Sequence, residues 1–207
     1  MDPTGTAYMY TAGKDFPRDI TILANHASIV YENETRADAS TGVYTHHLFF
    51  ADVSKSKLDP LVCKEGTPAA SNLFSLNAGA PISVFSGSAE DDVEMSYVST
   101  GNNFNTGYYV ASGDKILFSA DLVNYRPYVQ DVFVSVELEY LKSKPTNFAD
   151  THMSTINVGM CNGTDGLVKP PPGVKKFSVL SKEMTASKNL RFMNLAGHLH
   201  GECNFRT

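Results

Sequence analysis

The chain has 207 residues, a formal net charge of −5 from 17 basic and 22 acidic side chains, and 42% hydrophobic residues. This length supports a buried core in one large domain or two small ones, and the composition excludes a disordered chain. The mildly acidic balance without a basic stripe argues against nucleic-acid binding. No apolar run approaches the roughly 20 residues that a membrane-spanning helix needs.

The N-terminus and the sequons point to different compartments. Residues 1–5 show neither the charged region nor the apolar stretch of a signal peptide, so the protein is either intracellular or a fragment whose leader was removed. The sequons at Asn33 and Asn162 fit surface loops of a secreted protein. Of these two indications we follow the sequons, and we expect a glycoprotein that enters the secretory pathway and is secreted.

Three cysteines, with no C-x-x-C motif, exclude a zinc ribbon or a thioredoxin-type site. They are Cys63, Cys161 and Cys203. The odd number allows one disulfide and one free thiol, or three free thiols.

Alternating, β-branched and aromatic runs separated by turn residues predict short strands along most of the chain. The predicted strands are Ile20–Tyr31, Val43–Val53, Glu94–Ser99, Lys115–Tyr125, Val129–Leu141, His152–Met160, Lys175–Ser181 and Leu190–His200. The alternation is strictest from Val132 to Tyr140. No segment longer than ten residues combines a helical period with caps. The pattern predicts an all-β chain that folds as an antiparallel, jelly-roll-like β-sandwich.

The segment Lys169–Gly173 contains three consecutive prolines and is the predicted domain boundary, since such a run stiffens the backbone and cannot enter a central strand. We predict a β-sandwich domain over residues 1–168 and a linker over 169–173. Residues 174–207 either add strands to the sandwich or begin a second domain. A long connection is predicted over Asp59–Pro81.

Two histidine clusters lie in predicted strands. On a strand, His198 and His200 leave the same face with Cα atoms roughly 6.6 Å apart, which suits two ligands of one metal ion. His46 and His47 are adjacent, so a regular strand would send them to opposite faces, and a β-bulge or a local twist is needed to bring both to one ion. Both flanking stripes are apolar, which predicts a strand buried on both sides.

Each motif alone is more often structural, with the imidazoles satisfied by hydrogen bonds, and the occurrence of both in strands is what favours a metal. Neutral imidazole favours Cu, Zn, Fe and Ni. His26 and His152 are interpreted as ordinary core or surface histidines with local hydrogen bonds.

The two motifs resemble those of the copper type II, ascorbate-dependent monooxygenases, the family of the peptidylglycine alpha-hydroxylating enzymes. The segment Thr45–Phe50 (THHLFF) is similar to that family's H-H-M-L-L-F motif. The run Gly197–His200 (GHLH) resembles the later H-x-H motif, as found in fungal and plant relatives. The resemblance spans about Ile20 to His200 and implies two jelly-roll sandwiches that each hold one copper.

By this resemblance, His46 and His47 would bind a copper that passes electrons. His198 and His200 would bind a copper that activates dioxygen and abstracts hydrogen from a substrate C–H bond, with ascorbate as a possible reductant. The substrate would be a small molecule or a peptide. In the family, a third histidine of the first site lies in a strand ending His-Tyr, and the counterpart here carries Asn124.

Asparagine is a poor ligand for Cu(I), so the first site would be incomplete or would recruit another group. The family's methionine ligand would fall well after His200, and no methionine lies beyond Met193. Either the chain is a fragment, or the four histidines serve one mononuclear site. Glu202 and Cys203 are further candidate ligands beside the second motif, and Cys203 can instead pair with Cys161.

Other functions fit the sequence less well. The alternative to an enzyme is a non-catalytic β-sandwich that binds metal, glycan or protein through loops such as Tyr97–Tyr109, although that segment also fits a hairpin turn. A hydrolase function has little support, because the sequence lacks the G-x-S-x-G nucleophile elbow. The acidic run Glu90–Asp92 lacks the spacing of an EF-hand and is interpreted as a solvated turn.

Overall fold

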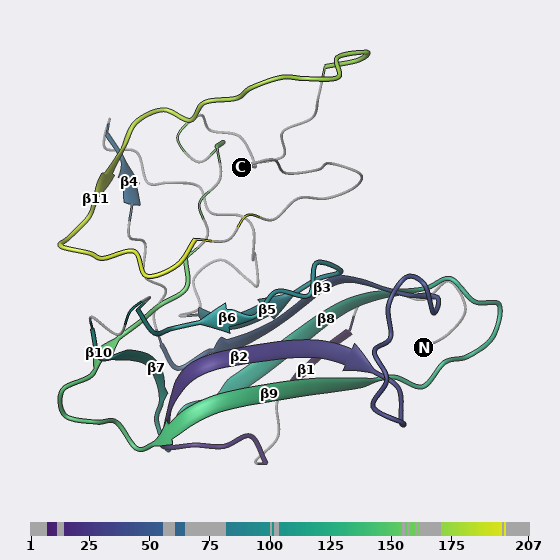
Figure 1. Cartoon of the computed structure of the whole chain (residues 1–207), viewed down its shortest axis with the longest axis horizontal. Coiled ribbons are helices and arrows are strands. Elements are labelled where there is room, and N and C mark those ends of the chain that lie inside the picture. The colour runs from purple at the N-terminus through teal and green to yellow at the C-terminus, as the bar shows by residue number, and fades with distance from the viewer. Residues whose placement is uncertain are drawn as a thin grey trace.

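The computed structural model describes residues 8–11, 15–55, 61–64, 82–99, 101, 104–154, 156, 158–159, 161, 171–195 and 197. Within these residues every regular element is a β-strand (Figure 1). The strands are β1 (Tyr8–Thr11), β2 (Ile20–Val30), β3 (Val43–Asp52), β4 (Leu61–Cys63), β5 (Ser83–Ser88), β6 (Met95–Ser96), β7 (Thr106–Val110), β8 (Ile116–Asn124), β9 (Phe133–Lys142), β10 (Ala149–Asp150) and β11 (Met184–Ala186). The predicted all-β fold class is confirmed, and the described residues contain no helix that could cross a membrane.

Two sheets form the sandwich. The first has four strands in the order β1-β8-β3-β5, and every neighbouring pair in it is antiparallel. In the second sheet, β2 pairs along its length with β9 and, in successive parts, with β7 and β6, while β10 adds a short parallel pairing to β7. Figure 1 shows β2 and β9 running side by side across β8 and β3.

An aromatic core joins the two sheets. Phe50 of β3, Phe85 of β5 and Tyr108 of β7 belong to one buried cluster. The ring centroids of Phe50 and Phe85 are 6.3 Å apart, and those of Phe85 and Tyr108 are 4.9 Å apart. The burial of these large apolar rings is the main stabilising contribution at the centre of the sandwich.

The strands that contain long alternating runs were predicted correctly. The predictions starting at Ile20, Val43, Lys115 and Val129 correspond to β2, β3, β8 and β9, and the one at Glu94 corresponds to the short β6. The apolar side chains of the strictest run, such as Val134 and Val136, pack against the core.

The predicted strand Lys175–Ser181 was wrong, and the predicted strands His152–Met160 and Leu190–His200 were wrong in their described parts. The described residues of His152–Met160, Lys175–Ser181 and Leu190–His200 are irregular. Six strands were missed, namely β1, β4, β5, β7, β10 and β11. β5 (SVFSGS) has few apolar residues to give an alternation, β4 lies in the predicted connection Asp59–Pro81, and most of β7 lies in the segment Tyr97–Tyr109 that was interpreted as a loop or a hairpin turn. Because β4 and β11 gain their hydrogen bonds from each other, tertiary contact rather than local pattern defines them.

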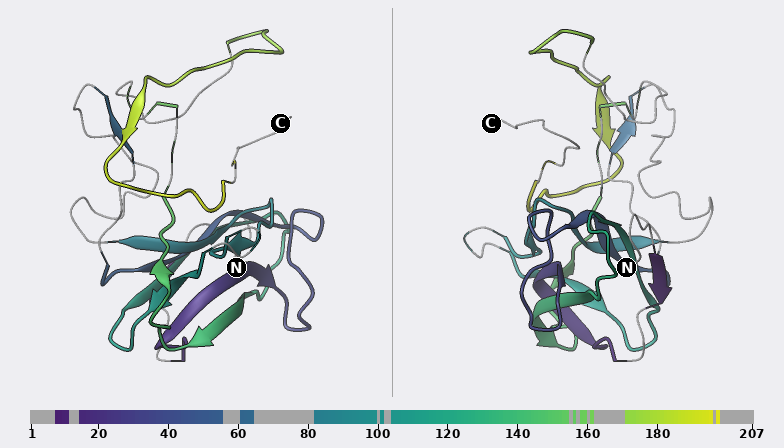
Figure 2. Two further views of the ribbon diagram at one scale, coloured as in Figure 1. Left: turned by 60° about the vertical axis from the view of Figure 1, so that its left-hand side comes forward. Right: turned by 90° about the vertical axis from the view of Figure 1, so that its right-hand side faces the viewer.

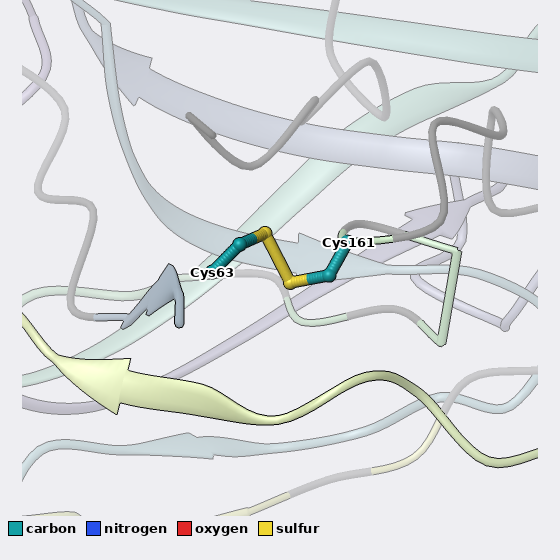
Figure 3. Close-up of a disulfide and its surroundings, with 2 residues drawn as sticks. All are labelled: Cys63 and Cys161. Atoms are coloured by element: carbon teal, nitrogen blue, oxygen red, sulfur yellow. A yellow bond between two sulfur atoms is a disulfide. The ribbon is translucent and has the colours of Figure 1, made fainter. Parts of the chain in front are cut away.

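A small third sheet pairs β4 with β11 antiparallel, so that Met184 lies opposite Cys63. This pair lies to one side of the sandwich in every view (Figures 1 and 2). A disulfide between Cys63 and Cys161 ties β4 to the segment that follows β10 (Figure 3). This bond excludes the pairing of Cys161 with Cys203, and Cys203 lies outside the described residues. The division at 169–173 stays a prediction.

The disulfide closes a long loop, because its cysteines are 98 positions apart in the sequence. Such a cross-link restricts the unfolded chain, and its loss typically costs about 2–5 kcal/mol. We therefore expect Cys63→Ser to lower the free energy of unfolding by about 2–5 kcal/mol in urea denaturation. Cys203→Ser is the control, since it removes a sulfur but keeps this bond. An unchanged urea midpoint in Cys63→Ser would contradict the prediction.

Candidate metal centre

A β-bulge brings His46 and His47 to the same face of β3. Thr45 pairs with Leu122 and His47 pairs with Asp121, so β3 advances two residues while β8 advances one. His46 is the extra residue. In a regular strand adjacent side chains alternate between faces, and one inserted residue cancels one alternation. The bulge that the sequence requires for both histidines to reach one ion is therefore present.

The bulge also changes which residues of β3 are buried. Leu48 and Phe50 are buried in the core, while Tyr44, His46 and His47 are only partly buried on the other face. The prediction of a strand buried on both sides was wrong for this half of β3. The apolar stripe expected to continue through His46 is interrupted at the bulge, and both imidazoles are accessible from solvent.

Asp121 of β8 completes a cluster with the two histidines. One ligand atom from each of the three residues lies within 4.8 Å of the others, and this is the group of three possible metal ligands found among the described residues. Asp121 Oδ2 lies 2.6 Å from His46 Nδ1, and the imidazole centroids are 4.1 Å apart. The side chains of His46 and Asp121 are 36% and 38% exposed. An ion can reach all three groups from the surface.

The donor set fits a transition metal. Ligand atoms that share one ion at about 2.0–2.2 Å can be at most about 4.4 Å apart, so small side-chain rotations bring the three groups into coordinating positions. Imidazole nitrogen suits copper, zinc and iron, and two imidazoles with one carboxylate are a recurring set for divalent ions. Copper is thus compatible with the residues present.

Aromatic rings border the cluster on one side. The ring of Tyr44 stacks at 6.1 Å on His46 and at 6.2 Å on Tyr125. Burial raises the pKa of the Tyr44 hydroxyl, and the negative charges of Glu90 and Asp121 raise it further. Tyr44 therefore stays a neutral phenol near neutral pH and adds no charge beside the imidazoles.

Glu90 stabilises the approach to the bulge. Its carboxylate accepts hydrogen bonds from the backbone N–H of Ala39, at 2.8 Å, and of Thr45, at 3.3 Å. It therefore ties the turn before β3 to the residue that immediately precedes His46. The acidic run was interpreted as a solvated turn, and at Glu90 it also has this structural role.

Asn124, the counterpart of the family's third histidine, points away from the cluster. It is three positions from Asp121 on a regular part of β8, which places it on the opposite face, and it is buried. Its amide donates to the Tyr128 carbonyl at 2.9 Å, and its oxygen accepts from Arg126 N at 2.9 Å and from Gln130 Nε2 at 2.7 Å. This residue holds the chain after β8 rather than a metal.

The second predicted cluster lies beyond the described part of the chain. His198, His200, Glu202 and Cys203 are all outside the described residues, so the pairing of the two motifs stays a prediction.

The two histidines interpreted as ordinary have local partners. His26 lies 2.8 Å from Asp92, which also pairs with Arg36. His152 is partly buried against the edge of the Tyr108 ring, with a centroid distance of 6.4 Å. Burial lowers the pKa of His152, which favours the neutral imidazole.

Asp121 was not recognised from the sequence. The strand that carries it was predicted, but a polar residue between Ala120 and Leu122 fits an ordinary alternating strand and gave no signal of a site. Its closeness to His46 depends on the register between β8 and β3, which local patterns do not determine.

Comparison with known proteins finds distant relatives at the level of sequence alone. The chain is 23% identical over 181 residues to a protein named "Probable copper-dependent oxygenase M1" from Phoma sp., an alignment that covers 87% of this chain and 41% of the relative. It is 23% identical over 174 residues to "Probable copper-dependent oxygenase clz3" from Cochliobolus lunatus, covering 84% of this chain and 50% of the relative. No family model and no solved structure matches the chain.

The chain therefore spans about half, or less, of the length of these curated relatives. The names of both relatives describe copper-dependent oxygenases, and a cluster that contains two imidazoles is compatible with a copper ligand set.

Because Asn124 points away from the cluster, we predict that its replacement affects the stability of the fold but not the binding of metal. Asn124→Ala removes three hydrogen bonds made by a buried amide, so we expect the free energy of unfolding to fall by about 2–4 kcal/mol. Copper stoichiometry of the folded protein should stay at the wild-type value, measured below the unfolding transition by elemental analysis after dialysis. Loss of copper from folded Asn124→Ala protein would show that this residue belongs to the metal site after all.

Proposed function

We propose that this chain is the copper-binding part of a copper-dependent, monooxygenase-like oxidoreductase, and that His46 and His47 bind one copper ion. The observation that carries the proposal is the bulge, because it brings two adjacent imidazoles to one exposed face beside a carboxylate. The names of the distant relatives support copper as the metal and oxygenation as the activity.

Bound copper would supply one-electron chemistry with dioxygen, using a reductant such as ascorbate, for the hydroxylation of a C–H bond in a small-molecule or peptide substrate. The chain's own residues prepare the ligands. Before an ion binds, Asp121 restrains the His46 ring through Nδ1, and Tyr44 stacks against the same ring. These contacts reduce the rotational freedom that the imidazole would lose on binding an ion. His198 and His200 are proposed as ligands of a second copper.

A secretory location is part of the proposal. A structural disulfide such as Cys63–Cys161 is typical of oxidising compartments and rare in the cytosol. The sequon residue Asn33 is exposed in a turn between β2 and β3, where a glycan can be accommodated. Both features support secretion and glycosylation of the chain.

A non-catalytic copper-binding module is the second candidate function. The solvent accessibility of the cluster at His46, His47 and Asp121 favours this candidate, because an ion could bind and leave there without taking part in a catalytic reaction. A catalytic site must also hold a substrate next to the metal. The two candidates share the same ligands and differ in whether dioxygen is consumed.

The proposal predicts that the double variant His46→Ala/His47→Ala loses one equivalent of copper relative to the wild-type protein, measured by elemental analysis after dialysis against excess Cu(II). Both side chains are partly exposed, so the variant should remain folded. His26→Ala/His152→Ala is the matched control and should keep the wild-type stoichiometry. Copper content that is unchanged by the loss of His46 and His47 would contradict the proposed site.

Oxygen consumption separates the two functions. Copper-loaded protein with ascorbate should consume dioxygen faster than the same concentration of His46→Ala/His47→Ala protein, measured with an oxygen electrode in the presence of catalase. Equal rates in the two proteins, with copper bound by the wild type, would favour the binding module.

A further inference from the structure

We propose that Asp121 is the third ligand of the metal at His46 and His47, and that its carboxylate makes this a site that prefers Cu(II) over Cu(I). The inference rests on the proposed function for the presence of copper at the two histidines. It concerns a residue that the copper-monooxygenase resemblance does not include, and it changes the expected donor set from three imidazoles to two imidazoles and an oxygen anion.

The position of Asp121 is fixed by the same register that creates the bulge. Asp121 is the residue of β8 that pairs with His47, so it lies directly opposite the end of the bulge. Side chains of directly paired residues leave the same face of a sheet. Asp121 Oδ2 comes within 2.6 Å of His46 Nδ1, so the carboxylate already contacts one of the two imidazoles.

The residue expected from the resemblance cannot supply the third ligand. Asn124 is buried on the opposite face and its side chain is committed to Tyr128, Arg126 and Gln130. Within the described residues, Asp121 is the one carboxylate or thiol whose ligand atom lies within 4.8 Å of both imidazoles. The proposal therefore places the third ligand three positions earlier along β8 than the resemblance does.

The chemistry of the carboxylate determines the preferred oxidation state. Soft thiolate and thioether ligands select Cu(I), whereas carboxylate oxygen is a hard donor. An anionic oxygen also lowers the electrostatic cost of the higher charge of Cu(II) in a partly buried site. The same set of two histidines and one carboxylate holds Zn(II) and Fe(II) in other proteins, so a preference for divalent ions is expected.

A different role for Asp121 makes different predictions. If the carboxylate only accepts a hydrogen bond from His46 Nδ1–H, His46 binds copper through Nε2 and Asp121 positions the ring without touching the ion. In that arrangement Asp121→Asn weakens copper binding by at most about 100-fold, and both oxidation states of copper are affected to the same extent.

The test uses Asp121→Asn and Asp121→His in the full chain, with Asp131→Asn as a control that removes an exposed carboxylate outside the cluster. Affinity for Cu(II) is measured by competition with a chelator, and affinity for Cu(I) by anaerobic competition with a chromophoric ligand. The number of nitrogen ligands is obtained from the electron paramagnetic resonance spectrum of the Cu(II) form. Circular dichroism checks that each variant is folded.

If Asp121 is a ligand, Asp121→Asn should weaken Cu(II) binding by about 100-fold or more, and Cu(I) binding by less than about tenfold. A residue that only orients a ligand without touching the ion typically accounts for no more than about 100-fold. Asp121→His should recover Cu(II) binding, add one nitrogen to the spectrum and tighten Cu(I) binding relative to the wild type. Asp131→Asn should match the wild type in every measurement.

The inference is overturned if Asp121→Asn weakens both oxidation states equally, or if Asp121→His adds no nitrogen ligand. It also fails if Asp121→Asn binds Cu(II) as tightly as the wild type. In these cases, copper that is still lost with His46→Ala/His47→Ala shows that the proposed function stands and that the role of Asp121 alone was wrong. Wild-type protein that binds no copper would overturn both.

Discussion

The alternation of side chains along a β-strand is the constraint on which the candidate site depends. Two adjacent residues of a regular strand cannot present their side chains to the same ion, because the backbone sends them to opposite faces. The inserted residue in β3 removes this conflict at His46 and His47. Without the bulge, one imidazole would be directed into an apolar core, where each ring nitrogen would need a hydrogen-bond partner.

The sandwich around the bulge keeps it in place. On the C-terminal side of the bulge, Leu48 and Phe50 are buried in the core, and on the N-terminal side Glu90 binds the backbone N–H of Thr45. β3 is also held by β8 on one edge and by β5 on the other, so it is a central strand of its sheet. A shift of register would remove all of these contacts together, which is why the extra residue stays at His46. The inserted residue is thus flanked by regular pairing of β3 with β8 both before and after it.

The sequence predicted the parts of this arrangement that depend on local pattern. The alternation in β2, β3, β8 and β9 was strong enough to define the strands, and the H-H dipeptide itself indicated that a bulge was required. The role of Asp121 could not be predicted, because it depends on which residue of β8 lies opposite His47. The partner of Cys63 was equally inaccessible, since the disulfide joins segments 98 positions apart. The strands β4 and β11 exist only as a pair and carry little pattern of their own.

The central claim is that one ion is held jointly by the two adjacent imidazoles. Anomalous X-ray diffraction at the copper absorption edge, from crystals of the copper-loaded chain, tests it most directly. The account predicts one anomalous peak about 2.0–2.2 Å from a ring nitrogen of His46 and from a ring nitrogen of His47. A copper peak next to only one of these rings, with the other imidazole turned into the core, would contradict it.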